Sequence, residues 1–365
     1  MRVLFLQRQP CIRAMKYAIG LRARVPGIRL GFACQGRTLT SWYGAGDELF
    51  ERWWHLPASD PHEALAAAVA EFRPDVIHSH NLPDVLTVLA LDVADGRVPV
   101  IHDVHDMQSL RSTPYEDGFD DPEDQDVLEL EREAVEDCAG LIAVSEEMRE
   151  ELSARYTLPA HTLLFANYAL SRDIAQPVAP GRSDGGPLRV VYQGSLSANG
   201  SHYDLRDHFR AVGDAGLLLD VYPNRDAPAF RELARTVPGM RLMRSLAPAD
   251  LMRALPAHDV GWAAFNPLLN AAHLDTALPN KAFEYLASGL PIAAGPHGAL
   301  RRLVREHGVG VAIDRAGELA ARVEETGLAR LREQVRDRRL LFTVEGHIWS
   351  LAELYAEVAS AAVPA

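Results

Sequence analysis

Short apolar runs alternate with longer segments of helical periodicity along most of the chain. A short apolar run bounded by turn residues is typical of a buried strand, whereas apolar spacings of three and four indicate a helix. In the first half, the pattern predicts strands at residues 3–6, 29–33, 74–78, 98–104 and 141–144, with helices at 15–21, 61–72, 84–93 and 128–138. Ser145 is expected to cap the helix that follows the last of these strands. Strands that alternate with helices in this way predict βαβ units around a parallel sheet.

Residues 171–187 interrupt the alternation with proline, glycine, serine and charged residues, which is typical of a linker. The alternation then resumes, with strands expected at 188–192, 217–222, 240–242, 260–263 and 291–294, and helices at 205–212, 228–235, 248–255 and 281–288. The sequence therefore predicts two Rossmann-like α/β domains, at 1–170 and 188–345. Ligands of such sheets bind beyond the carboxyl ends of the strands, so we expect a ligand cleft between the domains.

Composition and charge limit the possible functions of these domains. The chain has 365 residues, 48% of them apolar and 24% charged, which is typical of soluble globular proteins. It has no apolar run of the ~18 residues that a membrane span needs, and its first residues turn polar too early for a signal peptide. Three scattered cysteines favour reduced thiols and a cytoplasmic location. The net charge of −13 argues against nucleic acid or anionic lipid as a partner.

Lysine occurs only at Lys16 and Lys281, and arginine supplies the other basic residues, a bias typical of high-GC bacterial genomes. Asn280 is expected to cap the helix in which Lys281 occupies the first turn. A cation there opposes the helix dipole at a cost of about 0.3–1 kcal/mol, unless an anion binds beside the amides of that turn. We therefore interpret Lys281 and the amides of residues 280–282 as a phosphate site. The alternative is an ordinary surface lysine.

The segment LPNKAFEYLASGLPI at 278–292 resembles the donor-site signature of the GT-B glycosyltransferases, particularly the retaining family-4 type. That signature has two glutamates separated by seven residues and followed by Gly-x-Pro. Glu284 matches the second glutamate, and the resemblance implies that it binds the ribose of a nucleotide sugar. The first glutamate, which contacts the transferred sugar, falls on Thr276, with Asp275 adjacent, so the sequence departs from the family at this point.

Other stretches resemble the same family, at 74–81, 98–106, 141–145, 191–195 and 342–355. By this resemblance His105 acts on the donor sugar, and Gly194 with Ser195 forms the phosphate-facing loop of the second domain. The last helix, at 346–365, is expected to cross back to the first domain.

Two further departures concern loops. The first strand is followed by 7–10 (QRQP) where relatives have two glycines, and Arg8 is expected in the acceptor cleft together with His80 and Asp106. After Gly194, His202 is the first basic candidate for donor binding, with Arg206 further on. Ala282 and Asn280 complete the expected donor contacts.

Several other polar residues allow a functional and a structural interpretation. His78, His80, His102 and His105 cluster at the ends of two adjacent strands, but without cysteine or a carboxylate set we favour backbone and solvent partners over a metal. His297 is expected either over the donor or in a surface loop. Trp53 and Trp54 are expected to pack, and the acidic segment 113–126 to be a solvated loop, with a mobile flap or a metal-binding DxD site as alternatives.

Together these features predict a glycosyltransferase that moves a hexose from a UDP- or GDP-type nucleotide sugar to an acceptor hydroxyl with retention of configuration. The resemblance implies no enzyme nucleophile, no metal and no cofactor besides the nucleotide-sugar co-substrate. The acidic charge favours a soluble acceptor. Two alternatives stay open: a nucleotide-sugar epimerase or hydrolase of the same fold, and a non-catalytic GT-B partner or scaffold. Binding of UDP or GDP without sugar turnover would favour the scaffold.

Overall fold

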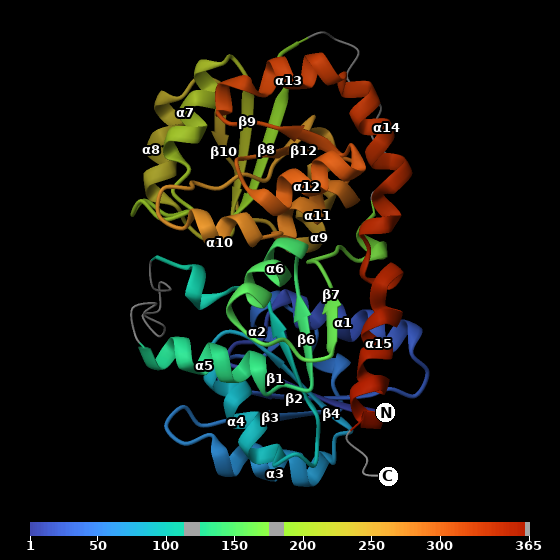
Figure 1. The fold of residues 1–365 in the computed structure, drawn as a ribbon. Helices are drawn as coiled ribbons and strands as arrows, with labels where there is room; N and C mark the ends of the chain where they lie inside the picture. The colour runs from blue at the N-terminus through green and yellow to red at the C-terminus, as the bar shows by residue number, and fades with distance from the viewer. Residues whose placement is uncertain (113–124, 175–185, 362–365) are drawn as a thin grey trace. The chain divides into compact units, whose positions relative to one another are not determined.

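The computed structural model describes residues 1–112, 125–174 and 186–361. The chain forms two compact units, one of residues up to Ala166 together with those from Val344 onward, and one of Asn167–Thr343 (Figure 1). The sequence-based boundaries are 170 and 345, and most of the expected linker lies outside the described residues. The same holds for most of the acidic segment 113–126, of which residues 125 and 126 begin a helix.

The first unit is built on a parallel sheet of seven strands in the order β3-β2-β1-β4-β5-β6-β7. The strands are β1 Arg2–Gln7, β2 Arg29–Cys34, β3 Arg52–His55, β4 Val76–His80, β5 Val100–Val104, β6 Gly140–Ala143 and β7 His161–Leu164. The helices are α1 Ile12–Arg24, α2 Leu39–Tyr43, α3 His62–Phe72, α4 Val85–Ala94, α5 Gln125–Glu136, α6 Glu146–Arg155 and α15 Val344–Ala361.

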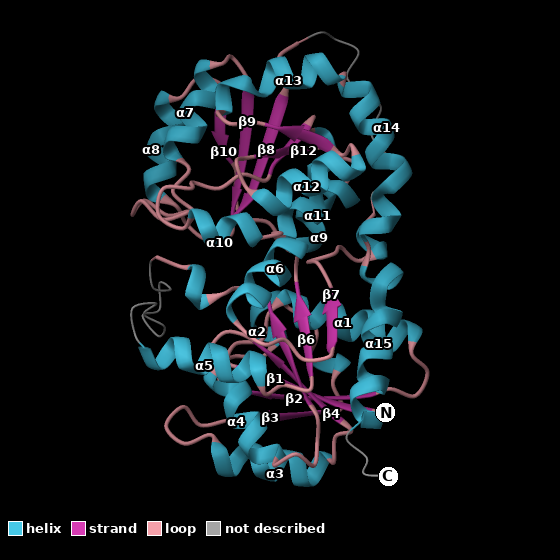
Figure 2. Ribbon diagram, in the orientation of Figure 1, coloured by secondary structure: helices cyan, strands magenta, loops and turns pink. Residues whose placement is uncertain are grey.

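The second unit repeats this plan with a parallel sheet of six strands in the order β10-β9-β8-β11-β12-β13 (Figure 2). The strands are β8 Arg189–Gly194, β9 Leu218–Pro223, β10 Met240–Leu242, β11 Val260–Trp262, β12 Ile292–Ala294 and β13 Gly310–Ala312. The helices are α7 Arg206–Asp214, α8 Pro228–Thr236, α9 Pro248–Ala254, α10 Ala271–Thr276, α11 Asn280–Ala287, α12 Gly298–His307, α13 Leu319–Thr326 and α14 Leu328–Arg338.

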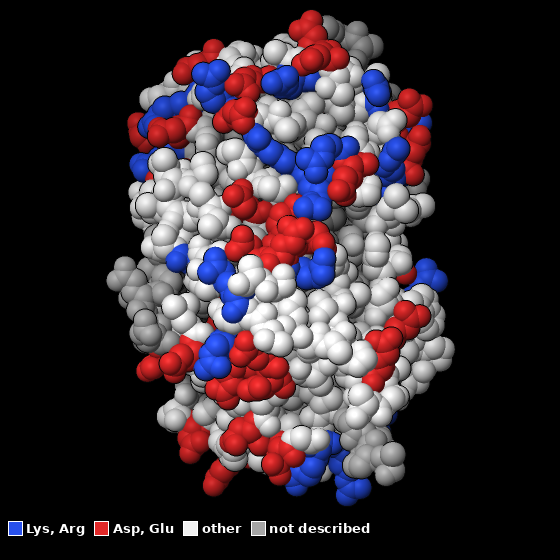
Figure 3. All heavy atoms as spheres, viewed as in Figure 1, with Lys and Arg blue, Asp and Glu red and all other residues white. Residues whose placement is uncertain are grey.

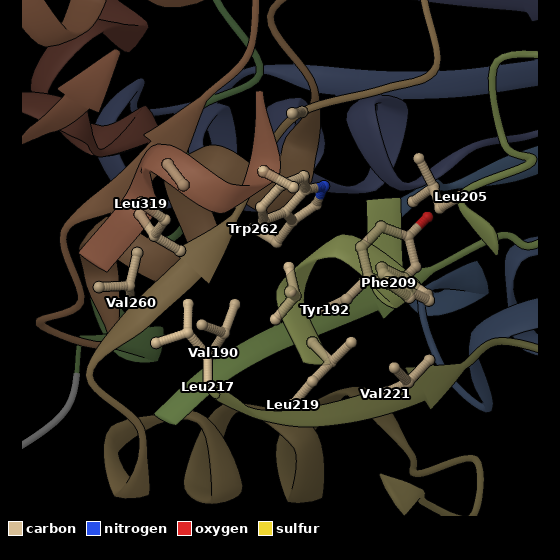
Figure 4. Close-up of a cluster of buried hydrophobic side chains, with 14 of the residues drawn as sticks. Val190, Tyr192, Leu205, Phe209, Leu217, Leu219, Val221, Val260, Trp262 and Leu319 are labelled. Carbon is tan, nitrogen blue, oxygen red and sulfur yellow. The ribbon is translucent and has the colours of Figure 1, made fainter. Parts of the chain in front are cut away.

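The doubly wound α/β prediction is confirmed, because helices cover both faces of each parallel sheet and the central strands are buried. All five residues of β4 and of β5 are buried, as expected for parallel strands covered on both sides. In the second unit the core gathers Val190 and Tyr192 of β8, Phe209 of α7 and Trp262 of β11 (Figure 4). None of the described helices is long and apolar enough to cross a membrane.

Ser145 caps α6 as predicted, with its hydroxyl accepting a hydrogen bond of 3.0 Å from the amide of Met148. The tryptophan pair was expected to pack and does so, but in an additional edge strand, β3, that the pattern did not predict. Trp53 stacks on Phe32 with ring centroids 4.6 Å apart, and Trp54 meets Phe72 edge-on. Aromatic residues favour a pleated, half-buried strand, although this one is too short to show a period.

Helix α15 belongs to the first unit and packs on α1 and β7. The close approach to α1 depends on Gly20, where a Cβ atom would come within 2.7 Å of a methyl group of Val344. On its inner face, Tyr355 is fully buried and its hydroxyl lies 2.6 Å from Nδ1 of His78 in β4. The last described helix of the chain is thus fixed to the first sheet by both packing and a buried hydrogen bond.

Candidate functional site

The candidate site of the second unit lies where the strand order of its sheet reverses, between β8 and β11. Ligands of open α/β sheets bind beyond the carboxyl ends of the strands at such a reversal. Helix α11 begins there at Asn280, with Pro279 as its N-cap residue and no side-chain cap. The expected cap by Asn280 is therefore wrong: Asn280 is already the first helical residue. Gly289, with φ +82°, follows the helix end as predicted.

Lys281 is buried at this point, with 8% of its surface exposed, and is not the surface lysine of the alternative interpretation. Its ammonium group donates a hydrogen bond of 3.1 Å to the hydroxyl of Tyr192. It also lies 4.3 Å from the ring centroid of Tyr192, 4.7 Å from that of Phe265 and 5.8 Å from that of Tyr203. Among the described residues no carboxylate forms an ion pair with it, so a buried cation keeps N–H donors for an external anion.

Burial lowers the pKa of the Lys281 ammonium from 10.5 to about 7, against the opposing effect of the Glu284 charge. Burial therefore disfavours the charged form of Lys281, although the aromatic rings and the Tyr192 hydroxyl fix the position of its amino group. A bound anion would restore the ordinary preference for the ammonium form, because an opposite charge within a few ångströms favours it. Such an arrangement suits the recognition of a phosphate.

Glu284 lies one helical turn after Lys281 and is half-buried. The side-chain amide of Gln193 donates a hydrogen bond to its carboxylate. The backbone amide of Gln193 donates a hydrogen bond of 2.9 Å to the hydroxyl of the buried Tyr285. The two charged residues of α11 thus both meet the end of β8.

The Gly194–Ser195 loop lies beside Lys281. A Cβ atom at Gly194 would stand 3.6 Å from the Lys281 nitrogen, and its φ of +127° is one that glycine adopts without strain. The carbonyl of Ser195 accepts a hydrogen bond of 2.5 Å from Tyr192, and its hydroxyl accepts one of 2.9 Å from Asn224. The amide of Ala282 is bonded to the Pro279 carbonyl at 3.1 Å, which argues against its predicted role as a phosphate donor.

The two residues at the place of the first family glutamate have partners within the protein. The Thr276 hydroxyl, buried, donates to the carbonyl of His273 in the preceding helical turn at 2.9 Å. The Asp275 carboxylate accepts a hydrogen bond of 3.0 Å from the amide of Gly298 at the start of α12. These contacts argue against both as the expected ligands of a donor sugar.

Of the remaining candidates in the second unit, His202 borders the site, whereas Arg206 and His297 have partners within the protein. The His202 ring lies against Tyr203, 4.1 Å between centroids, and so borders the aromatic group around Lys281. Arg206 is bound to Asp204, with contacts of 2.8 and 2.7 Å, and is not available as a second cation. His297 is fully buried, not in a surface loop: Nε2 accepts a hydrogen bond of 3.1 Å from the amide of Phe265, and burial lowers its pKa to about 4.

In the first unit, His105 follows the carboxyl end of β5 and is partly exposed. Its backbone amide donates a hydrogen bond of 3.0 Å to Oδ1 of Asn81, and its Nε2 lies 4.0 Å from the carboxylate of Asp106. Arg8 is half-buried, and its carbonyl accepts hydrogen bonds from the amides of Gln35 and Gly36 at 3.1 and 2.7 Å. The loop that lacks glycine is therefore fixed to the end of β2.

His80 lies elsewhere than expected. Its side chain is fully buried, stacked on His78 with centroids 4.3 Å apart, and its Nδ1 is 3.3 Å from the carboxylate of Asp103. Arg13 binds both oxygens of the same carboxylate at 2.9 and 3.0 Å. His102, on the opposite face of the sheet, contacts Thr87 at 2.9 Å. The expected backbone and solvent partners are thus wrong for His78, His80 and His102, and burial argues against an acceptor contact by His80.

His78, His80 and Asp103 are the described residues whose grouping could hold a metal, with ligand atoms within 4.8 Å of one another. Burial raises the pKa of Asp103, but the charge of Arg13 and the two histidines outweigh it and hold that pKa well below its usual range. Burial lowers the pKa of His78, and that of His80 to about 3. A metal cation here would meet the guanidinium already bound to its only carboxylate. We interpret the cluster as a buried ion pair with neutral histidines.

Tyr192, Gln193, Tyr203 and Phe265 contact the charged residues of α11, and the sequence pattern did not indicate a functional role for them. Tyr192 precedes the glycine loop by two positions, but a tyrosine in an apolar strand indicates a core residue. The fold brings them to α11 from the end of β8 and from the loops that follow β8 and β11.

Comparison with known proteins is consistent with this geometry. The sequence model of Glycosyltransferase Family 4 matches residues 36–163. Among solved structures, sucrose-phosphate synthase from Thermosynechococcus elongatus is similar with a TM-score of 0.72 at 14% identity over 99% of each chain. A glycosyltransferase from Rickettsia africae gives 0.71 at 12% identity over 98% of each chain.

Anabaena HepE, solved in complex with UDP, gives a TM-score of 0.71 at 16% identity over 98% of this chain and 100% of that one. No curated protein sequence matches the chain. The chain therefore has the GT-B fold, as predicted, and resembles the family-4 type of these glycosyltransferases.

Proposed function

We propose that this protein, which has the GT-B fold, is a glycosyltransferase that moves a sugar from a nucleoside diphosphate sugar to an acceptor hydroxyl. The match to Glycosyltransferase Family 4 supports the class of reaction. The similarity to HepE, whose structures contain UDP and UDP-glucose, supports the class of donor.

The observation that carries the proposal is the buried ammonium of Lys281 at the start of α11. It has one hydrogen bond, to Tyr192, and among the described residues no ion-pair partner. A buried charge without a counter-ion is costly, so it is retained where a ligand supplies the opposite charge. A diphosphate between Lys281 and the Gly194 loop would do so, with the first-turn dipole of α11 adding to the attraction.

In the proposed reaction, negative charge develops on the departing diphosphate while the sugar gains oxocarbenium character. Lys281 and the Gly194–Ser195 loop stabilise that charge. Stabilisation of developing charge by preorganised donors is usually the largest single contribution to catalysis. Glu284 accepts hydrogen bonds from the ribose hydroxyls, and His105 contacts the sugar. Transfer proceeds with retention, without a metal, and with the leaving phosphate oxygen accepting the proton of the acceptor.

The base is uracil or guanine in this proposal, the transferred sugar a hexose, and the acceptor a soluble molecule in the cytoplasm. The charge of −13 supports an acceptor that is not held on an anionic surface. The acidic charge also increases the need for a local cation, since a nucleotide is repelled at long range.

One observation favours a second candidate, a nucleotide-binding protein without transferase activity. Thr276 and Asp275 occupy the place of the family's sugar-binding glutamate, and both are engaged with the backbone of their own unit. A site that binds the nucleotide and lacks this sugar contact could serve regulation or assembly.

Calorimetric titration with UDP, GDP and ADP tests the proposal. We expect micromolar to millimolar binding of at least one, and a loss of about tenfold to 150-fold in Lys281→Met, as for removal of a hydrogen bond to a charged group. Arg210→Met, which removes an exposed cation of α7, is the matched control and should bind as the wild type does. Equal affinity of Lys281→Met and wild type would exclude the phosphate role. Binding without turnover of any nucleotide sugar would favour the second candidate.

A further inference from the structure

Two consecutive residues at the end of β8 contact the two charged residues of α11. Tyr192 holds Lys281 through its hydroxyl, and Gln193 holds Glu284 through its side-chain amide. The partners lie far apart in the sequence, 89 positions for the first pair and 91 for the second. The function proposed above needs the charged residues, but it does not by itself require a polar residue at either position of β8.

The hydroxyl of Tyr192 has a defined donor direction. Its single proton goes to the carbonyl of Ser195, at 2.5 Å, so towards Lys281 it can only accept. The ammonium is therefore the donor at 3.1 Å. One hydroxyl thus ties the phosphate-facing loop and the cation into a single chain of hydrogen bonds.

The position of this hydroxyl is fixed by the core. The Tyr192 ring is fully buried and meets Phe209 edge-on with centroids 5.4 Å apart (Figure 4). The same ring presents its face to the Lys281 nitrogen at 4.3 Å. Phenylalanine would fill this space equally well, so packing explains the ring but not the hydroxyl.

Gln193 is held in a similar way. Its backbone amide donates a hydrogen bond to the buried hydroxyl of Tyr285, the residue that follows Glu284 in α11. This bond fixes Gln193 beside the helix. Its side-chain amide then donates to one carboxylate oxygen of Glu284. A carboxylate can accept about four hydrogen bonds, so this contact orients Glu284 and leaves capacity for hydroxyl groups of a ligand.

We propose that Tyr192 and Gln193 are positioning residues of the nucleotide site: Tyr192 directs the Lys281 ammonium at the diphosphate, and Gln193 directs the Glu284 carboxylate at the ribose. This inference rests on the proposed function and adds residues to the same site. Both act through another side chain, so their tests need measurements that a purely structural role would leave unchanged.

The two-lysine composition makes the first test direct. With 13C-labelled lysine, the side-chain NMR signals of Lys281 and Lys16 can be followed separately during a pH titration of the ligand-free protein. The titratable groups that face Lys281 are Glu284 on its own helix, Tyr192 on β8 and Tyr203 on the following loop, and the charge of Glu284 raises the pKa of Lys281.

In Tyr192→Phe the ammonium loses the hydrogen bond that favours its charged form, so its midpoint should fall by about one pH unit while that of Lys16 stays unchanged. Tyr156→Phe, which removes a hydrogen-bonded hydroxyl from the first unit, is the matched control and should shift neither. An unchanged Lys281 midpoint in Tyr192→Phe overturns the first half of the proposal, whether or not a nucleotide binds.

The second test uses UDP and 2′,3′-dideoxy-UDP as probes. Wild type should prefer UDP, and Gln193→Met, of similar size but without the amide, should reduce that preference at least threefold. A general loss of folding would weaken both probes equally and leave the ratio intact, which would overturn the role of Gln193. Tyr192→Phe should weaken both probes about tenfold at pH 8 and only about twofold at pH 6, where about half of the Lys281 side chains in the variant are still protonated.

These measurements separate the inference from the function on which it rests. If the wild type binds no nucleoside diphosphate, the proposed function fails, and with it the assignment of Tyr192 and Gln193 to a nucleotide site. If it binds UDP and the Lys281 midpoint and the probe ratio are both unaffected, the function stands and the positioning roles are wrong.

Discussion

Lys281 combines burial, an aromatic environment and the start of a helix, and each of these affects its charge. Burial lowers its pKa to about 7, whereas the ring faces of Tyr192 and Phe265 attract the ammonium form. The pKa of about 7, set by burial against the opposing charge of Glu284, places its titration near neutral pH. A ligand anion should therefore change the protonation state of this residue when it binds.

We expect UDP binding at pH 8 to be accompanied by uptake of close to one proton. Above pH 7 the ammonium is largely deprotonated in the unbound protein, and the bound diphosphate raises its pKa again, so the proton is taken from the buffer. Calorimetry in buffers of different ionisation enthalpy measures this number. At pH 6 the uptake should vanish, and a value near zero at both pH values would contradict the expectation.

Glu284 provides the second prediction at this scale. Glu284→Gln keeps the size of the side chain but accepts hydrogen bonds at one oxygen only, so UDP should bind about tenfold more weakly. The melting temperature should stay within about 2 °C, because the residue is half-buried and outside the apolar core. A variant that loses stability but not affinity would make Glu284 a structural residue.

Strand β4 distributes polar side chains to both faces of the first sheet. His78 and His80 lie on one face, where α1 and α15 cover them, and Ser79 lies on the other, 2.8 Å from Thr87 of α4. Alternate residues of a strand face opposite sides, so one short element ties three helices to the sheet. The contact with Tyr355 fixes α15 in particular.

Tyr355→Phe should therefore reduce the free energy of unfolding by about 1–3 kcal/mol, because Nδ1 of the buried His78 loses its partner. Ser360→Ala, on the exposed side of the same helix, is the control and should change it by less than about 0.5 kcal/mol. Urea denaturation of the three proteins measures the difference. Equal values for both variants would show that the buried hydrogen bond does not stabilise α15.

The same cluster predicts sensitivity to acid. Burial lowers the pKa of His78 and His80, so as the pH falls below about 6.5 the unfolded chain binds protons that the folded chain does not. Stability contributed by the neutral histidines is present above pH 6.5 and is lost as the pH falls towards the folded values. His80→Asn, which does not titrate, should show a shallower decline between pH 6.5 and 4 in denaturation experiments. If the free energy of unfolding falls with pH as steeply in His80→Asn as in wild type, His80 is not a source of the acid sensitivity.

On the scale of the whole molecule, the candidate residues are divided between the units. Lys281 belongs to the second unit and His105 to the first. Acidic and basic side chains both gather on the face shown in Figure 3, and over the whole chain the acidic ones prevail. In the function proposed above, an anionic donor is therefore attracted by local groups and not by the net charge.

His105→Ala should lower turnover of a nucleotide sugar about tenfold to a thousandfold and leave the affinity for UDP within about twofold. The histidine is proposed to contact only the sugar, and loss of one preorganised polar contact has effects of this size. Turnover, UDP affinity and melting temperature are measured on the one variant. Full activity, or parallel loss of affinity and turnover, would refute the assignment.

Much of the fold follows from local patterns in the sequence. The alternation of apolar runs and amphipathic segments is sufficient to predict two parallel sheets, because strand and helix periods are properties of neighbouring residues. The Ser145 cap and the Gly289 helix end are predictable for the same reason. The scarcity of lysine distinguishes Lys16 and Lys281 by composition, and the expected helix start separates Lys281 from Lys16.

The tertiary structure decided which partner each polar side chain meets. His80 is buried against Asp103, Asp275 accepts a hydrogen bond from the amide of Gly298, and Lys281 lies on the ring of Tyr192. Such partners come from crossover connections that bring distant segments to one edge of a sheet, and a hydrophobic pattern does not encode them. The sequence by itself thus determined the architecture of the two units and the identity of Lys281 as the charged residue of the candidate site. The contacts of α11 with the end of β8 and with the loops after β8 and β11 determined what surrounds that charge, because burial and hydrogen-bond geometry depend on contacts between residues far apart in the chain.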